Sequence, residues 1–190
     1  MIIKFLKIKQ SDSKKIYKWR TKSRVENYME TRFRSSDKNQ RKWIKDTNKR
    51  KDFLQWIVSF NNKKIGYLSV YNFLNKQKNL SWGFYIGDEK FLFISGIISI
   101  SLHNYFFLKT NTKKINGIVL SHNTNVLKSR LAQGYKVTSK TKKNVYIQPL
   151  KKFVFKNKIS VSKKSWIKEN KKTLQIMPKI QFYKSTKFNN

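Results

Sequence analysis

One stretch of the sequence decides the fold: residues 80–135, which read LSWGFYIGDEKFLFISGIISISLHNYFFLKTNTKKINGIVLSHNTNVLKSRLAQGY. Aromatic and β-branched residues at 79–86 predict a strand, and the long apolar run at 94–108 predicts a helix. A strand, a loop and a helix in this order place backbone N–H groups at the helix N-terminus, where they can hold a phosphate-bearing ligand. Gly96 is the position in the loop where a ligand could approach the backbone most closely.

The second half of this stretch again predicts a strand followed by a helix. A strand is expected at 114–120, and a helix then begins at Asn123 and ends at Gly134-Tyr135. N-terminal to this stretch, the sequence pattern predicts further strands and helices. These are a strand at 2–8, a helix that starts at Ser11 or Ser13 and carries Trp19-Arg20, helices at 25–29 and 38–47, and a hairpin of strands at 53–60 and 65–73. Three antiparallel strands followed by helix, strand and helix predict an α+β fold with a mixed, mainly antiparallel sheet.

The C-terminal part is rich in lysine and shows little periodicity. Strands are expected at 136–139 and 144–150, which complete a predicted domain of residues 1–150. Residues 151–190 are predicted to form a basic extension, with at most one strand near 153–155 and then a mobile tail.

Length and composition exclude several classes of protein. The 190 residues suggest one domain with a substantial core. No run of 18 apolar residues occurs, so we predict no membrane span, and the first residues are too interrupted by lysine for a signal peptide. The chain has no cysteine, which excludes disulfides, thiolate metal sites and a cysteine nucleophile. We expect a cytoplasmic protein that uses no metal.

The net charge of +35 has two explanations that the sequence leaves open. The chain has 37 Lys, 7 Arg, 18 Asn and one Ala, as a genome rich in A/T codons would produce, but this bias does not explain why only 9 residues are acidic. Some of the charge therefore suits an anionic ligand, such as coenzyme A, a nucleotide sugar or, through the basic tail, a nucleic acid. The scarcity of arginine favours a small ligand over nucleic acid.

The order of elements over residues 2–150 resembles the GNAT acetyltransferases. Asn123, Val126 and Gly134-Tyr135 match the family pattern Asn-x-x-[Ala/Ser]-x7-Gly-[Phe/Tyr], with Val126 at the small-residue position. Gly96 matches the last position of the family's phosphate loop, [Gln/Arg]-x-x-Gly-x-[Gly/Ala]. Ile94 replaces the earlier glycine of that loop, and Phe91 replaces its leading polar residue.

This resemblance implies direct transfer of an acetyl group from acetyl-CoA to an amine. It implies donor contacts with Phe84, Tyr85, Ile86, Ile94, Ser95, Gly96, Ile97, Asn123, Val126 and Arg130. Arg130 stands where the family often has a tyrosine that protonates the departing thiolate. An arginine does not release a proton near neutral pH, but it can stabilise a thiolate or a phosphate. The alternative is that Arg130 lies on a solvated helix face.

The candidates for catalysis are His122, Glu89 and Tyr85, which lie where the two strands of the core end. His122 titrates in the useful range and directly precedes Asn123, so it is the leading candidate for a general base. The alternative is a loop histidine that caps the helix. His103, in the middle of an apolar helix, is predicted to be a packing residue.

A narrower resemblance rests on Trp19-Arg20, Met29, Trp43 and Ile65-Gly66-Tyr67. These are similar to the acetyltransferases that act on nucleotide-linked 4-amino sugars, including those of the pseudaminic acid pathway. The resemblance implies that the substrate contacts Trp19, Arg20, Met29 and Trp82. Acetylation of a protein N-terminus and a basic nucleic-acid-binding protein that has lost acetyl-CoA remain alternatives. We expect a monomer or a homodimer.

Overall fold

The computed structural model describes residues 3–30, 36–141, 144–174 and 181–182. The strands of the described part are Ile3–Lys7 (β1), Phe53–Phe60 (β2), Lys63–Tyr71 (β3), Asn79–Ile86 (β4), Lys114–Leu120 (β5), Lys136–Lys140 (β6), Val145–Ile147 (β7), Lys152–Val154 (β8), Lys156–Ser162 (β9) and Gln181–Phe182 (β10). Its helices are Ser13–Arg20 (α1), Ser23–Glu26 (α2), Asp37–Asn48 (α3), Ser95–Lys109 (α4), Thr124–Ala132 (α5) and Lys163–Glu169 (α6). Short 3₁₀ turns occupy Gln10–Asp12 (η1), Glu89–Ile94 (η2), Gln148–Leu150 (η3) and Lys171–Thr173 (η4).

The described strands form one large sheet and a small hairpin. The sheet has the order β10-β1-β2-β3-β4-β5-β9-β6, and β7 pairs with β8 separately. Neighbouring strands of the sheet are antiparallel except for the β1–β10 and β4–β5 pairs, which are parallel. The predicted α+β class and the mainly antiparallel mixed sheet are confirmed.

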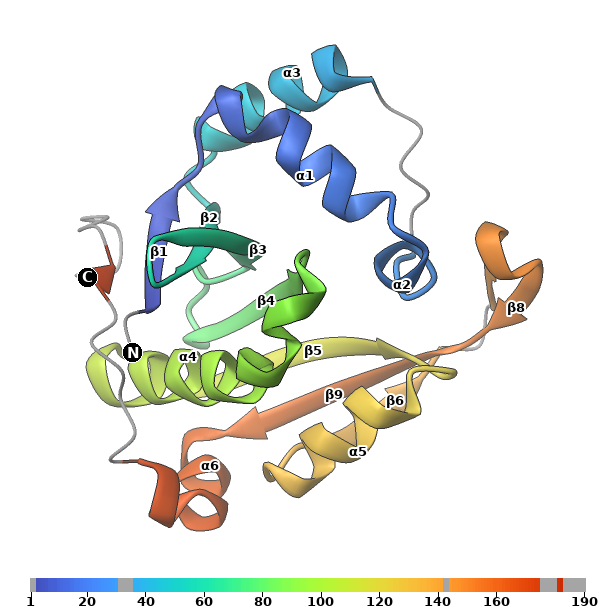
Figure 1. Cartoon of the computed structure of the whole chain (residues 1–190). Helices are drawn as coiled ribbons and strands as arrows, with labels where there is room; N and C mark the ends of the chain where they lie inside the picture. Colours follow the sequence, from blue (N-terminus) through green and yellow to red (C-terminus); the bar gives the residue numbers. More distant parts are fainter. Residues whose placement is uncertain (1–2, 31–35, 142–143, 175–180, 183–190) are drawn as a thin grey trace.

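Helices cover both faces of the sheet, with α1 and α3 on one side and α4, α5 and α6 on the other (Figure 1). Ile94, Ile98, Leu102 and Phe106 recur every four residues, so they form one face of the helical run and pack into the larger core. On the opposite side, Ile16 and Trp19 of α1 and Ile44 of α3 pack against Ile57 and Tyr67 in a second core.

The strands β4 and β5 pair only at their amino ends. The register joins Asn79 to Lys114, Leu80 to Ile115 and Ser81 to Asn116, and no pair follows on these two fully described strands. From Trp82 onward the two strands therefore part, and backbone groups along the facing edges have no ladder partner.

The C-terminal region differs from the prediction of a basic extension. Strand β9 lies between β5 and β6 in the central sheet, and Trp166 of α6 is fully buried in the larger core. Ile159 and Val161 are the buried residues of β9 that join the same core, and they alternate with lysine and serine. The domain thus extends past residue 150. The predicted tail falls largely on residues 175–180 and 183–190, which lie outside the described residues.

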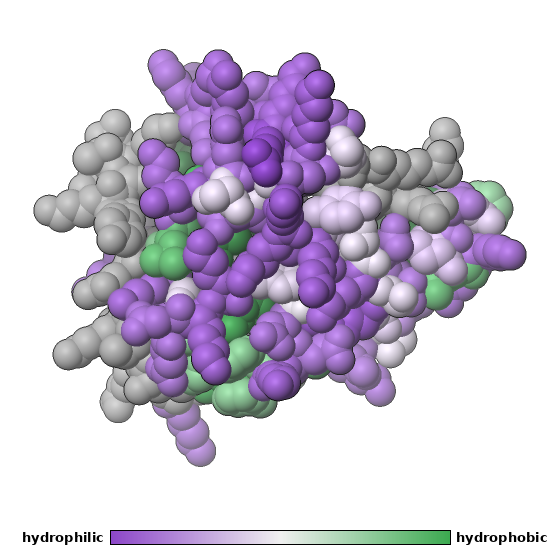
Figure 2. Space-filling model, turned by 45° about the horizontal axis from the view of Figure 1, so that its top comes forward, coloured by the Kyte–Doolittle hydropathy of each residue, from purple (hydrophilic) through white to green (hydrophobic). Residues whose placement is uncertain are grey.

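One helical run meets the length and composition of a membrane span. It is Glu89–Lys109, which joins η2 to α4, and half of its apolar window is buried inside the molecule. A core helix of a globular domain meets the same criteria, and the absence of a membrane span stays a prediction. The face shown in Figure 2 is mostly hydrophilic, and apolar side chains show only in small patches.

Candidate active site

A cavity of about 590 Å³ fills the gap between β4 and β5. It reaches α5 on one side of the sheet and α1, α3 and the segment after α2 on the other. The cavity therefore connects the two faces of the sheet where the strands part. Nine of the residues predicted to bind donor or substrate line it: Arg20, Met29, Trp82, Phe84, Tyr85, Ile86, Asn123, Val126 and Arg130.

Helix α5 presents one face to this cavity. Asn123, Val126 and Arg130 follow the spacing i, i+3 and i+7, which brings side chains to the same side of a helix. The helix ends at Ala132, and Gly134 two residues later has a φ of 88°, the left-handed conformation that glycine adopts without strain. The glycine turns the chain so that Tyr135 points back into the core, where it is only 3% exposed.

Arg130 is directed inward rather than onto a solvated face. Its Nη1 donates to the hydroxyl of Ser99 on α4 and to Oε1 of Gln133, the latter at 2.8 Å. Its guanidinium carbon lies 4.6 Å from the centroid of the Trp82 ring. Burial lowers the pKa of Arg130 below its ordinary value, and the nearby Tyr135 acts in the opposite direction. No carboxylate of a described residue forms an ion pair with this arginine.

His103 and Tyr135 form a buried pair next to Arg130. Nδ1 of His103 lies 2.6 Å from the backbone oxygen of Ser99, so this nitrogen carries the proton. Nε2 therefore accepts the hydroxyl proton of Tyr135 at 2.5 Å, and the Tyr135 oxygen accepts from Trp82 Nε1 at 3.4 Å. Burial, reinforced by the charge of Arg130, lowers the pKa of His103 to about 3. His103 is thus a neutral packing residue, as predicted.

The opposite side of the cavity is lined by further aromatic groups and by Gln40, which the sequence analysis did not single out. The hydroxyl of Tyr67 donates to Gln55 Oε1 at 3.1 Å, and the Tyr67 and Tyr85 rings stack at 5.5 Å. Gln40 lines the cavity, is 1% exposed, and its Oε1 has no hydrogen-bond partner among the described residues. The signal was present in the sequence, because Gln40 lies one turn before Ile44 on the buried face of α3.

The sequence of residues 6–149 matches the family model described as "Acetyltransferase (GNAT) domain". The chain belongs to the GNAT acetyltransferase family. No protein of curated function matches its sequence. Its structure is similar to the spermidine N-acetyltransferase of Vibrio cholerae solved with CoA and spermine, with a TM-score of 0.76, 11% identity, and coverage of 87% of this chain and 98% of that one. It is also similar to the aminoglycoside acetyltransferase AAC(6')-Ib solved with coenzyme A and kanamycin, with a TM-score of 0.65, 12% identity, and coverage of 87% and 98%.

The loop predicted to hold the donor phosphates is partly helical. Phe91 N donates to Asp88 O at 3.1 Å, Lys90 N donates to the Asp88 carboxylate at 3.3 Å, and Ser95 N donates to Leu92 O. Ile94 is fully buried in the core, and neither it nor Ser95, Gly96 or Ile97 lines the cavity. A Cβ built on Gly96 meets no atom within 4 Å, so open space faces the position predicted to approach the pyrophosphate.

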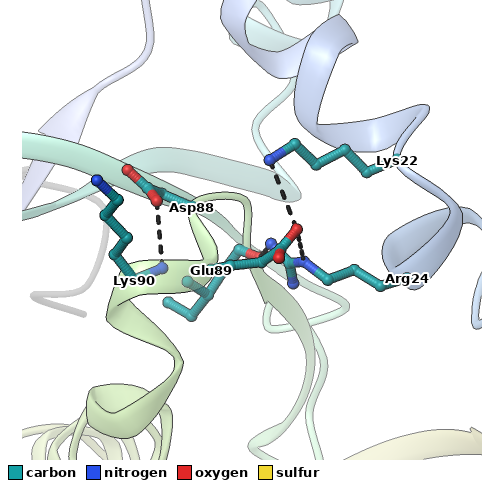
Figure 3. Close-up of polar contacts among 6 residues, drawn as sticks. Lys22, Arg24, Asp88, Glu89 and Lys90 are labelled. Carbon is teal, nitrogen blue, oxygen red and sulfur yellow. Dashed lines mark hydrogen bonds and ion pairs between the residues drawn. The ribbon is translucent and has the colours of Figure 1, made fainter.

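Glu89 is held in an ion pair outside the cavity. Its Oε1 lies 3.0 Å from Arg24 Nε and 3.8 Å from Lys22 Nζ, and both cations point at it in Figure 3. Arg24 also donates through Nη2 to Ile86 O at 2.8 Å. The carboxylate thus fastens the segment after β4 to α2. No geometry supports the predicted base role of Glu89, because it does not line the cavity.

His122 also lies off the cavity wall. Its Nε2 donates to the backbone oxygen of Asn27 at 2.8 Å, and its ring stacks on Tyr28 at 5.1 Å. Nδ1 is buried and has no partner among the described residues. His122 connects the start of α5 to the segment after α2 and does not cap the helix, so both predicted roles differ from what the structure shows. Tyr85 alone of the three catalytic candidates lines the cavity.

Trp19 differs from its predicted place at the substrate. It is 6% exposed and belongs to the second core, beneath Gly87. A side chain at Gly87 would collide with the Trp19 ring, so the glycine permits this close packing. Across the described ranges, no group of three or more His, Asp or Glu side chains is placed to hold a metal ion.

Proposed function

We propose that this GNAT acetyltransferase acetylates the amino group of a small, nucleotide-activated amino sugar. The observation that carries the proposal is one continuous cavity that passes from α5, through the gap between β4 and β5, to α1 and α3. Direct transfer between two substrates requires one passage in which both reacting groups meet. The cavity offers such a passage, and transfer within it needs no covalent enzyme intermediate.

The donor side of the cavity fits an acyl-CoA. The unpaired edge of β4 beyond Ser81 offers backbone donors and acceptors to an amide-bearing arm. Asn123 and Val126 would flank that arm, and the N-terminus of α4 with Gly96 would face the phosphates. Acetyl-CoA supplies the acetyl group as a thioester. Arg130 then places a fixed positive charge beside the sulfur as negative charge develops there.

The substrate side supports an anionic acceptor that carries a ring. Arg20 and Arg24 line it, and guanidinium groups suit phosphate oxygens. Trp43 and Phe53 line the same part, and Trp43 is 39% exposed. Aromatic faces of this kind stack on sugars and on bases. These features favour a nucleotide sugar over the spermine and kanamycin named for the compared structures.

The donor half is tested first, by thermal denaturation with acetyl-CoA or CoA in moderate salt, which suppresses non-specific binding of polyanions. A ligand at a hundredfold excess over its Kd stabilises the fold by about 2.7 kcal/mol. For a domain of this length, that energy raises Tm by roughly 5–10 °C. No shift with either ligand would refute acetyl-CoA as the donor. Tight, salt-sensitive binding of transfer RNA in that case would favour the nucleic-acid alternative.

The acceptor half is tested by acetyl incorporation into a panel of amines. The panel contains a uridine-diphosphate-linked 4-amino sugar, spermine, kanamycin and a peptide with a free N-terminus. We expect the nucleotide sugar to give the highest kcat/KM. A higher value for the peptide would favour the N-terminal acetyltransferase, and a higher value for spermine or kanamycin would refute the proposed acceptor.

A further inference from the structure

Among the residues that the structure describes, the ionisable side chains that line the cavity are of two kinds. They are the three arginines Arg20, Arg24 and Arg130 and the four tyrosines Tyr28, Tyr67, Tyr85 and Tyr135. An arginine keeps its proton under all physiological conditions, and a phenol must ionise before it can act as a base. Burial raises the pKa of Tyr67 and Tyr85 above the ordinary value, and it raises the pKa of Tyr135 to about 12. The wall of the cavity is therefore cationic or neutral near pH 7.

Every carboxylate side chain and both histidines lie in the described part of the chain, because the residues outside it include no Asp, Glu or His. Those on the segments around the cavity act on protein groups. Glu89 pairs with Arg24 at 3.0 Å, and Glu30 pairs with Lys156 at 2.6 Å. Glu26 acts on Arg20, whose pKa is lowered by burial and raised in part by this carboxylate.

The two imidazoles are also engaged. His122 donates through Nε2 to Asn27 O, and its remaining ring nitrogen, Nδ1, is buried off the cavity wall. His103 packs edge-on against Trp82, and its Nε2 accepts the Tyr135 hydroxyl proton. These positions leave the described wall of the cavity without a carboxylate that could pair with an incoming ammonium ion, and with three arginines that repel it. Nearby positive charge and desolvation both disfavour an ammonium ion and lower its pKa. The neutral amine meets neither penalty.

From this arrangement we infer that the enzyme takes its acceptor as the free amine, and so selects amines that are already neutral near physiological pH over strongly basic amines. The inference rests on the proposed function. The amine lone pair attacks the thioester carbonyl carbon, the C–S bond breaks, and its electron pair stays on sulfur as a thiolate. The proton that the nitrogen then loses goes to solvent.

The size of the selection follows from the acceptor alone. An amine with an α-amino-like pKa near 7.8 is about one-tenth neutral at pH 7. An alkylamine with a lysine-like pKa near 10.4 is neutral to only about 0.04%, so its free-base concentration is roughly 300-fold lower. Without a carboxylate or imidazole on the cavity wall to take the proton, this difference in free-base concentration lowers kcat/KM for the alkylamine, and only the greater nucleophilicity of the more basic amine offsets it in part.

The test compares the pH profiles of kcat/KM for two acceptors, the uridine-diphosphate-linked 4-amino sugar and spermidine, between pH 6 and 10. We expect the acidic limb of each profile to follow the pKa titrated for that acceptor in solution. One limb at the same pH for both acceptors would reveal a base on the enzyme and would overturn the inference. A lack of turnover with both acceptors, together with a normal acetyl-CoA thermal shift, would overturn it and leave the donor half standing. Loss of the thermal shift would refute the proposed function itself.

A charge introduced into the cavity provides a second test. Gln40→Glu changes a buried lining residue to a carboxylate of the same shape, and Gln77→Glu makes the same change at an exposed position away from the cavity. We expect Gln40→Glu to raise the ratio of kcat/KM for spermidine to that for the nucleotide sugar at least tenfold. Gln77→Glu should leave this ratio unchanged. Equal ratios for the two variants would show that cavity charge does not set the selection. If Gln40→Glu fails to fold, the pH profiles of the parent enzyme decide whether the inference holds.

Discussion

Replacing Arg130 with glutamine removes a charge from the interior of the active site while keeping a polar side chain. The arginine is positioned by Ser99 and Gln133, and its guanidinium carbon lies 4.6 Å from the Trp82 ring and 5.9 Å from the Tyr135 ring. Because no described carboxylate pairs with it, its full charge is available to a ligand. A buried cation without a partner is costly, which suggests that an anion completes the site during the reaction.

The expected effect of Arg130→Gln comes from the lost contact with the developing thiolate. A charge-assisted hydrogen bond contributes roughly 1.5–3 kcal/mol, so kcat/KM should fall by about tenfold to a few hundredfold. An interaction that forms only in the transition state lowers kcat and kcat/KM equally. A contact with the phosphates of the bound donor would instead raise KM for acetyl-CoA and leave kcat unchanged, so the two roles are distinguishable.

A direct assay follows the thiol of bound CoA by its thiolate absorbance in the ultraviolet, without any acceptor. A cation within 4–6 Å lowers the pKa of an acid by about 1–3 units. We expect the parent to lower the thiol pKa by this amount and Arg130→Gln to restore the solution value. The matched control is Arg41→Gln, since Arg41 is exposed and pairs with Asp37 on the surface of α3. Unchanged kinetics and an unchanged thiol pKa in Arg130→Gln would refute the role of this cation.

Three further variants test the rest of the site. Gly96→Val fills the open space before the phosphates, so we expect near-native circular dichroism and no thermal shift with acetyl-CoA; an undiminished shift would mean that the phosphates bind elsewhere. His122→Ala should reduce turnover less than about threefold, because the ring holds Asn27 and lies off the cavity wall, and a loss of a hundredfold would restore His122 as the base. His103 is neutral in the folded state with a pKa near 3 and titrates near 6.5 when unfolded, so the free energy of unfolding, measured in urea, should fall by about 2 kcal/mol between pH 7 and pH 5. His103→Gln should reduce this loss, and an equal loss in the variant would contradict the assignment.

The sequence predicted the elements around the site because their patterns are local. The alternation of β4, the four-residue repeat of α4 and the glycine after α5 each depend on neighbours a few residues away. The face formed by Asn123, Val126 and Arg130 could be read from helical spacing in the same way. The local patterns predicted the elements, and the resemblance to the GNAT family supplied the nine predicted contact residues that line the cavity.

The errors came from contacts between distant parts of the chain. Trp19 follows Ile16 at helical spacing, which is more typical of a core position than of a substrate contact, and its packing beneath Gly87 shows that it is a core residue. Glu89 and His122 lie at the ends of core strands as predicted, but their partners Arg24 and Asn27 are 65 and 95 residues away. The residue types in a single sequence do not show which distant side chains pair.

The C-terminal strand β9 shows a different difficulty. Its sequence Lys156–Ser162 alternates lysine and serine with Asn157, Ile159 and Val161, and the lysines around it obscure this short alternation. The strand is stabilised in the sheet because it pairs with β5 on one side and with β6 on the other. Strand propensity depends on such cross-strand neighbours, which single-sequence patterns do not reveal.

The few carboxylates of this chain explain the character of its active site. Asp12 binds Lys64, Glu30 binds Lys156 and Glu89 binds Arg24, pairs that join segments 52, 126 and 65 residues apart. Only 9 acidic residues accompany 44 basic ones, so carboxylates engaged in joining segments are not available to line the cavity. Of the arginines on the cavity wall, Arg24 pairs with Glu89, whereas Arg130 pairs with no described carboxylate and keeps its influence on a bound ligand. This charge suits the anionic donor and the anionic acceptor that we propose, and it underlies the inference that the reacting amine arrives without its proton.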